Sequence, residues 1–427
     1  MTLQGTRVNG QFDSVLLLTT AALVLTGVLM VYSSTSVVSP SARAQMSSNA
    51  VNDGQPAANL NLVDLRYLKK HLASVTLGIL FMIIAYNLPI DIYRRRALEI
   101  FFIALVLLIA VNLPMIGATV NGARRWLRIW QFTFQPSEAM KLAVVILMAR
   151  YLSSTDFTTD TVTVGNRLIN FKAFIKPIIL MVCIQAILLH QPDFGSAAII
   201  GVITFTMLFL ADVKLKYIFS VGLVFIPVVI KLVKEPYRLR RVLVFLDPWA
   251  DERNSGFQLI QSFVALGNGG VHGVGLGKSM QKLYFLPESK TDFIFAIIGE
   301  ETGLLGAVFV ICLFVLFFSR AILIMNGLTD RFMFFMASGI TLLIVLQALI
   351  NMCVVTGMVP TKGLPMPFIS YGGSSMIINL TEVGMLLNLA KNTTVPRTES
   401  VTHGINTTRR VNHRKARVFS YDKQQQM

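Results

Sequence analysis

The stretch PESKTDFIFA, residues 287–296, concentrates side chains that can move protons and hold anions. Glu288, Lys290 and Asp292 stand directly before a long apolar run. A carboxylate at such a boundary can accept a proton from a hydroxyl group; burial would raise its pKa, whereas Lys290 and a helix N-terminus would lower it. On a continuous helix Glu288 and Asp292 would share one face. Spacing alone favours Thr291 or Asp292 as a helix cap, with a general base as the alternative.

A second polar stretch is PTKGLPMPFISYGGSS, residues 360–375, where three prolines surround a lysine and hydroxyl groups follow. Its candidate binding residues are Lys362, Ser370 and Tyr371. Non-helical backbone survives at membrane depth only inside protein or along a polar cavity. The segment is therefore predicted to line a site, although a stiff connector would have the same composition.

Charged residues inside apolar runs are further candidates. Lys141, Glu300, Glu301 and Glu382 each interrupt such a run. An unpaired charge is costly there, so structural ion pairs are favoured, including one between Lys141 and a carboxylate across the bundle. Asp193, in HQPDFGS, is expected in a tight turn where it could cap the next helix.

The glycine run GNGGVHGVGLGK ends in Lys278 and permits tight turns and a close approach to a ligand. It lacks the strand, lysine and helix order of a phosphate-binding P-loop. The three cysteines and five histidines are scattered without metal-type spacing. That distribution argues against a zinc enzyme and against a disulfide framework.

The elements that must position these residues are membrane-spanning helices. Hydrophobic residues make up 54% of the 427-residue chain, charged residues make up 14%, and the mean hydropathy is +0.64. This composition is typical of a polytopic membrane protein. Apolar segments near the length of a bilayer span predict an all-α bundle of ten helices. They cover residues 14–38, 72–91, 99–117, 137–153, 174–190, 195–211, 216–234, 292–323, 332–358 and 371–390.

Loop charges predict the orientation of this bundle. Clusters of arginine and lysine between alternate spans are expected in the cytoplasm by the positive-inside rule. Both termini are then cytoplasmic, and the large loop 235–291 is extracytoplasmic. The membrane domain covers residues 14–390, between a short N-terminal segment, 1–13, and a basic tail, 391–427, that we expect to be disordered. Gly299 and Gly303, beside the two glutamates of the eighth span, predict a kink.

The outward loops are also basic, against the expectation of this rule. Their basic residues are Arg124, Arg125, Arg128, Arg238, Arg240, Arg241, Lys278, Lys282 and Lys290. A phosphate or pyrophosphate group outside the membrane would explain them, because Arg and Lys bind phosphate oxygens. Adhesion to anionic lipid headgroups is the alternative. Nucleic acid is not expected, because the net charge of +16 is spread over both membrane faces.

Several motifs occur in a characteristic order along the chain: NGARRW, FQPSEAMKL, QPDFGS, SGFQLIQS, the block from GNGG to GEE, and PTKGLPMPFISYGGSS. In this order they resemble the SEDS family of bacterial shape, elongation, division and sporulation proteins, over about residues 14–390. PTKG and the GNGG block are more similar to the division members of that family. An elongation role stays the alternative.

The resemblance implies a peptidoglycan glycosyltransferase that polymerises lipid II, an undecaprenyl-pyrophosphate-linked precursor, on the outer face of the cytoplasmic membrane at the division septum. It implies that Asp292 is the catalytic base and that Arg124, Arg125 and Trp126 of NGARRW matter for activity. It also implies a class B penicillin-binding protein as partner, beside other division membrane proteins. Relatives often have His where this chain has Lys290, a fixed cation in place of a titratable imidazole.

Residues and resemblance together suggest a mechanism in which basic side chains hold two lipid-linked pyrophosphates and Asp292 deprotonates the acceptor hydroxyl. Undecaprenyl pyrophosphate would then leave with inversion at the sugar. The candidate substrate-binding residues are Arg124, Arg125, Trp126, Lys141, Asp193, Lys278, Glu288, Lys290, Lys362, Ser370 and Tyr371. No cofactor is required, although Mg²⁺ or Mn²⁺ could bridge pyrophosphate and carboxylate. The rival functions are a lipid II flippase and a scaffold for the transpeptidase.

Overall fold

The structure is a computed structural model of the chain, and its described residues lie within one compact unit, Met1–Thr394. They are residues 13–35, 62–113, 117–120, 123–129, 132–155, 164–223, 234–252, 256–282 and 286–393. The predictions for the N-terminal segment and the basic tail fall almost entirely outside them. Residues 224–233 of the predicted span 216–234 also lie outside.

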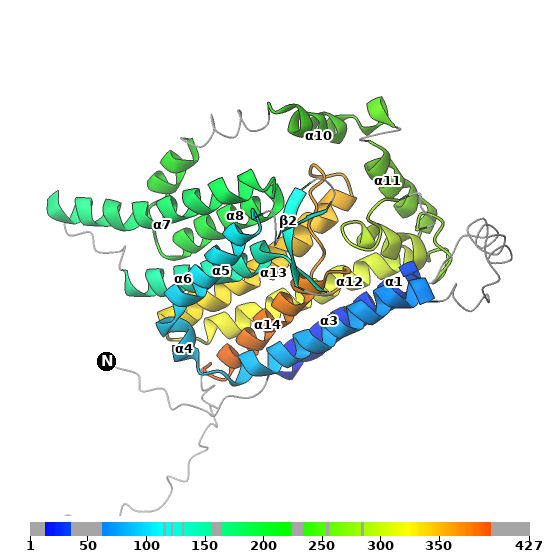
Figure 1. The fold of residues 1–427 in the computed structure, drawn as a ribbon. Helices are drawn as coiled ribbons and strands as arrows, with labels where there is room; N and C mark the ends of the chain where they lie inside the picture. The colour runs from blue at the N-terminus through cyan, green and yellow to red at the C-terminus, as the bar shows by residue number, and fades with distance from the viewer. Residues whose placement is uncertain are drawn as a thin grey trace, which may run out of the picture. The chain divides into compact units, whose positions relative to one another are not determined.

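A helix covers most of the described residues in each predicted span (Figure 1). The first half contains α1 (Ser14–Thr35), α3 (Leu62–Asn87), α4 (Ile90–Arg95), α5 (Ala97–Ala110), α6 (Pro136–Ser154), α7 (Val164–His190) and α8 (Phe194–Leu210). Residues 215–223 are helical as well. The second half contains α10 (Pro236–Leu246), the 3₁₀ helix η2 (Pro248–Asp251), α11 (Phe257–Gly269), α12 (Ile294–Asn326), α13 (Arg331–Val355) and α14 (Gly373–Ala390). The predicted loop 235–291 therefore holds helices of its own.

Length and composition identify spanning helices among the described residues. Four are long and apolar enough to cross a membrane: Ser14–Thr35, Tyr67–Asn87, Ile294–Asn326 and Arg331–Val355. Three shorter apolar helices are Ala97–Ala110, Phe174–His190 and Phe194–Leu210. Large apolar side chains such as Leu304 and Phe309 of α12 are more than half exposed, as expected for a surface that faces lipid. The chain is thus a mostly helical, multi-pass membrane protein.

A small antiparallel sheet lies between α5 and α6, and the all-α prediction is wrong for this segment. It consists of β1 (Gly117–Val120), β2 (Ala123–Ile129) and β3 (Phe132–Phe134), in the order β1-β2-β3. Ala118 pairs with Trp126 and Arg128 with Thr133. In β2, Leu127 is buried whereas the flanking Arg128 is exposed, which is the alternation of a half-buried strand.

The predicted kink in α12 is present at Gly303. Its backbone angles, φ 68° and ψ −164°, lie in a region that only glycine adopts readily. The glycine-rich loop after α11 enters this kink and takes up the backbone groups that the helix leaves unpaired. The N–H groups of Val274 and Gly275 donate to the carbonyls of residues 300 and 301, at 3.0 Å each, and the N–H of Leu304 donates to Gly270. The glycines therefore approach helix backbone.

Beside the kink, Glu301 forms an ion pair, as predicted, whereas Glu300 is held by hydrogen bonds from neutral groups. Lys282 Nζ lies 2.7 Å from Glu301 Oε1, and both side chains are almost fully enclosed. Ser33 of α1 donates its hydroxyl to Glu301 and accepts a hydrogen bond from Lys282. Glu300 accepts hydrogen bonds from the Ser279 hydroxyl and from the N–H of Met280. Lys282, predicted among the outward anion-binding residues, is instead a structural cation.

Candidate functional site

The first described turn of α12 places Asp292 just outside the helix. The N-cap of α12 is Phe293, with no side-chain capping bond, and residues 286–293 form successive turns. Glu288 has a φ of 54°, which interrupts any helix reaching back to it. The predictions that Thr291 or Asp292 caps the helix, and that Glu288 and Asp292 share a continuous helical face, are therefore wrong.

The backbone of residues 290–292 is fixed from one side. Three successive carbonyls accept hydrogen bonds, in order, from the N–H of Tyr371, the hydroxyl of Ser370 and the side-chain amide of Asn351. Ser370 Oγ also accepts the N–H of Met366 at 2.7 Å. Ser370 thus uses its hydroxyl to hold the turn that carries Asp292, while its predicted role in substrate binding stays a prediction.

The PTKG part of the second polar stretch lies against the Asp292 carboxylate, while its predicted role in lining a substrate site stays a prediction. A Cβ atom placed on Gly363 would lie only 3.1 Å from Asp292 Oδ2. The neighbouring Lys362 is half-buried, and burial lowers the pKa of its ammonium group. Within the described residues this ammonium makes no hydrogen bond or ion pair. A cation so placed is a natural binding partner for an anion.

Electrostatics tune the Asp292 carboxylate toward neutrality. Burial raises the pKa of Asp292 to about 7, and the negative charge of Glu288 acts in the same direction against the opposing charges of Arg241 and Arg125. The carboxylate accepts no hydrogen bond from the described residues, although the residue keeps part of its surface exposed. A carboxylate with a pKa near the working pH and free lone pairs is suited to general base catalysis.

Two arginines from distant parts of the chain are held near this carboxylate. Arg125 of β2 donates from Nε to the Gln191 carbonyl at 3.2 Å and from Nη2 to the Pro192 carbonyl at 2.6 Å. Arg241 of α10 donates from Nη1 to the Thr361 carbonyl at 3.0 Å. These contacts use only some of the five donors of each guanidinium group. The small sheet and the large loop therefore each deliver one cation to the same site.

The ammonium group of Lys290 lies over an aromatic ring. Its Nζ atom lies 4.6 Å from the centre of the Tyr67 ring, a cation–π distance. Tyr67 meets Tyr371 edge to face at 5.6 Å, and Tyr371 lies 6.0 Å from the His71 ring. The first turns of α3 thus provide an aromatic contact for the Lys290 side chain.

Lys141 and Asp193 occupy buried polar networks. Lys141 Nζ forms an ion pair with Glu138 Oε1 at 2.9 Å and donates to Gln347 Oε1 at 2.7 Å. Its partner carboxylate is on its own helix, so the predicted ion pair across the bundle is wrong, although Lys141 also acts electrostatically on Glu382 of α14.

Asp193 caps α8, as its turn motif predicted. It accepts hydrogen bonds from the N–H of Ser196 at 3.2 Å and from the hydroxyl of Ser137 at 2.8 Å. Gln135, two residues before Ser137, donates to the same carboxylate at 3.5 Å, and its N–H donates to Ser374 Oγ. Hydrogen bonds therefore join the segments FQPSE, QPDFGS and YGGSS to one another.

The remaining predicted residues lie nearer the surface. Arg124 and Lys278 are exposed and Trp126 is half-buried. Arg124 Nε donates to the Thr119 hydroxyl at 3.3 Å, within the sheet.

Sequence reasoning missed Asn351 and underused Arg241. Asn351 and Gln347 stand four residues apart in an apolar run, so they share one face of α13. That spacing of two buried amides was the available signal. Arg241 was predicted only as one of many outward cations, and nothing local distinguishes it from Arg240, which pairs with Asp251 at 3.5 Å.

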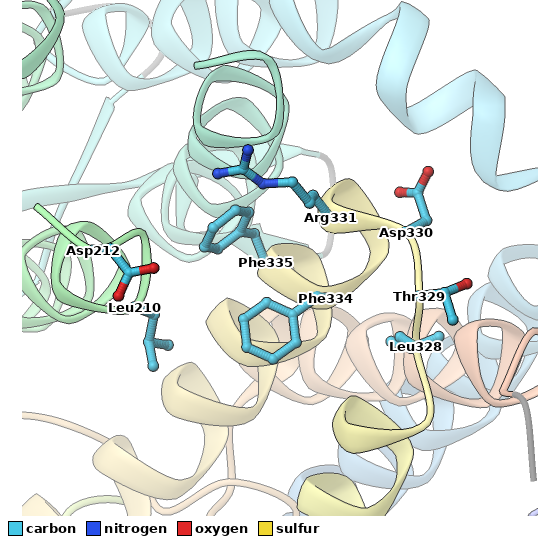
Figure 2. A pocket seen from close by; sticks show the side chains of 8 residues that line it. All are labelled: Leu210, Asp212, Leu328, Thr329, Asp330, Arg331, Phe334 and Phe335. Carbon is cyan, nitrogen blue, oxygen red and sulfur yellow. The ribbon is translucent and has the colours of Figure 1, made fainter. Parts of the chain in front are cut away.

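A separate pocket of about 320 Å³ lies near the other end of α12. It is lined by Leu210, Asp212, Leu328, Thr329, Asp330, Arg331, Phe334 and Phe335. The rings of Phe334 and Phe335 lie between Leu210 and Asp212 on one side and residues 328–330 on the other (Figure 2). Because the whole length of α12 separates this pocket from Asp292, it is not part of the candidate site.

Comparison with known proteins gives a consistent result. Residues 13–395 match the family described as cell cycle protein, FtsW/RodA/SpoVE. The chain is 39% identical over 386 residues to the probable peptidoglycan glycosyltransferase FtsW of Geobacter sp. (strain M18), covering 90% of this chain and 98% of that relative. It is 37% identical over 391 residues to the probable peptidoglycan glycosyltransferase FtsW of Coxiella burnetii, covering 90% and 98%.

Solved structures share the fold. A chain from work on the structural coordination of polymerization and crosslinking by a peptidoglycan synthase complex has a TM-score of 0.68 at 26% identity, covering 89% of this chain and 98% of its own. The rod shape determining protein RodA of Thermus thermophilus has a TM-score of 0.61 at 22% identity, covering 90% and 98%.

Proposed function

The chain belongs to the FtsW, RodA and SpoVE family of cell cycle proteins, and from this membership we propose that it is a peptidoglycan glycosyltransferase of cell division. The reaction is the polymerisation of lipid II into glycan strands at the outer face of the cytoplasmic membrane. Its relatives named peptidoglycan glycosyltransferase FtsW match along nearly their whole length, which supports one shared activity.

The observation that carries this proposal is the state of the Asp292 carboxylate. It accepts no hydrogen bond from the described residues, lies within electrostatic reach of Arg125 and Arg241, and has a pKa raised by burial to about 7. A base with these properties can take the proton of the acceptor sugar hydroxyl as the new glycosidic bond forms. The proton moves to Asp292, and the bond from the donor sugar to its pyrophosphate breaks.

The cations around Asp292 support the binding of the pyrophosphate groups. Arg125 of the sheet and Arg241 of α10 act electrostatically on the carboxylate, and Lys362 directly precedes Gly363, which lies beside it. Cations of this kind would stabilise the charge that develops on the departing pyrophosphate. Lys290, fixed against Tyr67, would add a further positive charge at the edge of the site.

The proposal extends to a divalent cation. Glu288 and Asp292 act on each other electrostatically and could contribute carboxylate oxygens beside a pyrophosphate. In the described part of the chain no group of three or more His, Cys, Asp or Glu side chains could hold a metal ion. Pyrophosphate would therefore supply the remaining oxygens, and the ion would neutralise its charge.

Polymerisation of fluorescent lipid II by the purified chain with its cognate transpeptidase, in the presence of moenomycin, tests the proposal. We expect glycan ladders from the parent, a loss of at least about 100-fold for Asp292→Asn, and parent-like ladders for the control Asp247→Asn. Asp247 is an exposed aspartate of the same loop that caps η2. Ladders of normal yield from Asp292→Asn would refute the base assignment.

A flippase is the second candidate and is less well supported. Its path would need available charges within the bundle, yet Lys141 pairs with Glu138 and Glu301 pairs with Lys282. If the parent chain made no ladder with any transpeptidase or divalent cation, but moved lipid II across vesicle bilayers, the flippase would replace the polymerase.

We also propose the finer topology and the partnership. The bundle has ten spans with both termini in the cytoplasm, lies at the division septum, and works with a class B penicillin-binding protein and other division membrane proteins. The solved peptidoglycan synthase complex, which combines polymerization and crosslinking, supports such a partner. Labelling of Asp247→Cys, but not of Arg409→Cys, by an impermeant maleimide on intact cells would be expected; the reverse would overturn the orientation.

A further inference from the structure

One buried amide joins the turn that carries Asp292 to the segment that faces it. Asn351 of α13 is only 2% exposed. Its Nδ2 atom donates to the Asp292 carbonyl and to the Leu364 carbonyl, at 2.8 Å in each case. Leu364 directly follows Gly363, the residue in contact range of Asp292 Oδ2. The same nitrogen therefore links the turn that carries Asp292 to the PTKG segment beside its carboxylate.

The orientation of this amide is decided by these two carbonyls. Asn351 Oδ1 is buried and accepts no hydrogen bond within the described residues. A rotated amide would turn its oxygen toward two carbonyl oxygens and lose both donor contacts. Proteins rarely leave a buried acceptor unsatisfied, so the two bonds made by Nδ2 outweigh that penalty.

A second amide supports the first. Gln347, one turn earlier on the same face of α13, donates from Nε2 to the Pro365 carbonyl at 2.8 Å. Its Oε1 accepts from Lys141, which is itself paired with Glu138. The carbonyls of residues 364 and 365 are thus held by consecutive amides of one helix, whose own position is fixed by a buried ion pair.

We infer that Asn351 is a positioning residue for glycosyl transfer, which sets the place of the Asp292 carboxylate relative to the PTKG segment. This inference rests on the proposed function, because it concerns the base assigned there. Without the amide, the carbonyls of Asp292 and Leu364 lose a shared donor, and the turn and the segment separate. A displacement of the base by about 1 Å can cost about 100-fold in rate while leaving binding intact.

A matched pair of variants tests the inference in the full chain with its transpeptidase. Asn351→Leu removes both donor contacts at similar volume. Asn388→Leu is the control, because Asn388 of α14 is also buried and donates from one Nδ2 to two carbonyls, those of Ala85 and Leu88. Both should lower the thermal unfolding temperature to a similar extent, since each leaves two buried carbonyls without a donor.

Activity should separate the two variants. For Asn351→Leu we expect kcat for lipid II polymerisation to fall about 10- to 100-fold, with KM changed less than about threefold. The pH of half-maximal rate should also move to lower values, because a loosened turn hydrates a carboxylate that now lies among Glu288, Arg125 and Arg241. Asn388→Leu should keep the parental kcat and pH profile.

Equal kcat and pH profiles for the two variants would overturn the inference and leave Asn351 as a structural residue. If Asn351→Leu does not fold, Asn351→Ser, which keeps one donor, should show a smaller loss of kcat in the same direction. An Asp292→Ala protein that polymerises normally would instead reject the proposed base, so the two failures are distinguishable.

Discussion

Two irregular segments contact α12, one at the kink and one at its start. The charged side chains at the kink have protein partners, whereas two of those at the start have none among the described residues. At the kink, Glu301 is paired with Lys282 and hydrogen-bonded to Ser33, and these groups are almost fully enclosed. At the start, the Asp292 carboxylate and the Lys362 ammonium make no hydrogen bond or ion pair with the described residues. Both segments have backbones pinned by hydrogen bonds, so the difference concerns side chains alone.

This difference separates structural charges from those available to a substrate. A buried charge that is fully paired cannot bind anything else without first losing its partner. A half-buried charge with an open coordination shell is costly to the fold and is retained where a ligand completes it. Both Lys282 and Lys362 are lysines, so their charge does not distinguish them. They differ in their partners, because Lys282 pairs with Glu301 and Lys362 has no partner among the described residues.

The largest contrast is expected from removing one carboxylate in each region. Glu301→Gln leaves Lys282 buried without a counter-charge and should lower the free energy of unfolding by about 3–5 kcal/mol. Asp292→Asn removes a carboxylate that has no donor and should leave stability equal or higher, while activity is lost. Thermal unfolding in detergent, measured beside lipid II polymerisation, checks both.

The double variant Lys282→Met, Glu301→Leu is the control for this contrast. It replaces the pair with apolar side chains and should recover most of the stability lost in Glu301→Gln. An unfolding temperature of Glu301→Gln equal to that of the parent would remove the distinction between the two regions.

Gly303→Ala should disturb the kink alone. The φ of 68° and ψ of −164° disfavour alanine, and its Cβ atom would lie 2.4 Å from Gly273 N and from the Val271 carbonyl oxygen. We expect destabilisation of about 3 kcal/mol, seen as a lower unfolding temperature. Gly267→Ala, in α11 with open space around its Cβ, should be neutral or stabilising. Equal effects at the two positions would contradict the close contact between the glycine-rich loop and the kink at Gly303.

The length of the apolar segments predicted the helices well, because a helix must be long and apolar enough to cross a bilayer. The predicted spans 137–153 and 195–211 correspond to Pro136–Ser154 and Phe194–Leu210. Glycine beside carboxylates predicted the kink for a sound reason, since both disturb an apolar helix. The sheet over residues 117–134 was missed because its strands are short and its arginines resemble a solvated loop.

The site was predicted in part, by composition more than by geometry. PTKG and Asp292 were expected near a site, but their contact at Gly363 depends on tertiary packing. The assumed helix from Glu288 to Asp292 failed because the chain turns there. Lys141 illustrates the converse: its partner Glu138 stands three residues before it, a local spacing that predicts the pair without any fold.

Lys362→Met tests whether a cation without a protein partner in the described part of the chain binds substrate. We expect KM for lipid II to rise about tenfold, equivalent to about 1.4 kcal/mol of binding, with little change in the unfolding temperature. The reason is that the ammonium group has no protein partner to lose among the described residues. Steady-state kinetics over a range of lipid II concentrations measures the effect.

The control for this variant is Lys176→Met, at an exposed position of α7. It should leave KM unchanged. A parental KM for Lys362→Met, or a fall in its unfolding temperature like that of Glu301→Gln, would place Lys362 with the structural charges.

The smallest effect is the pH dependence, and its sign follows from the raised pKa of Asp292. The base must be ionised, so the rate should rise with pH and reach half its maximum near pH 7, close to the pKa of about 7 that burial produces. Stability should move the other way. Between the ordinary aspartate pKa near 4 and pH 7 the folded state binds more protons than the unfolded state, so stability falls as the pH rises. In Asp292→Asn this contribution to the slope should vanish, and a slope unchanged from that of the parent would mean that Asp292 titrates as an ordinary exposed carboxylate.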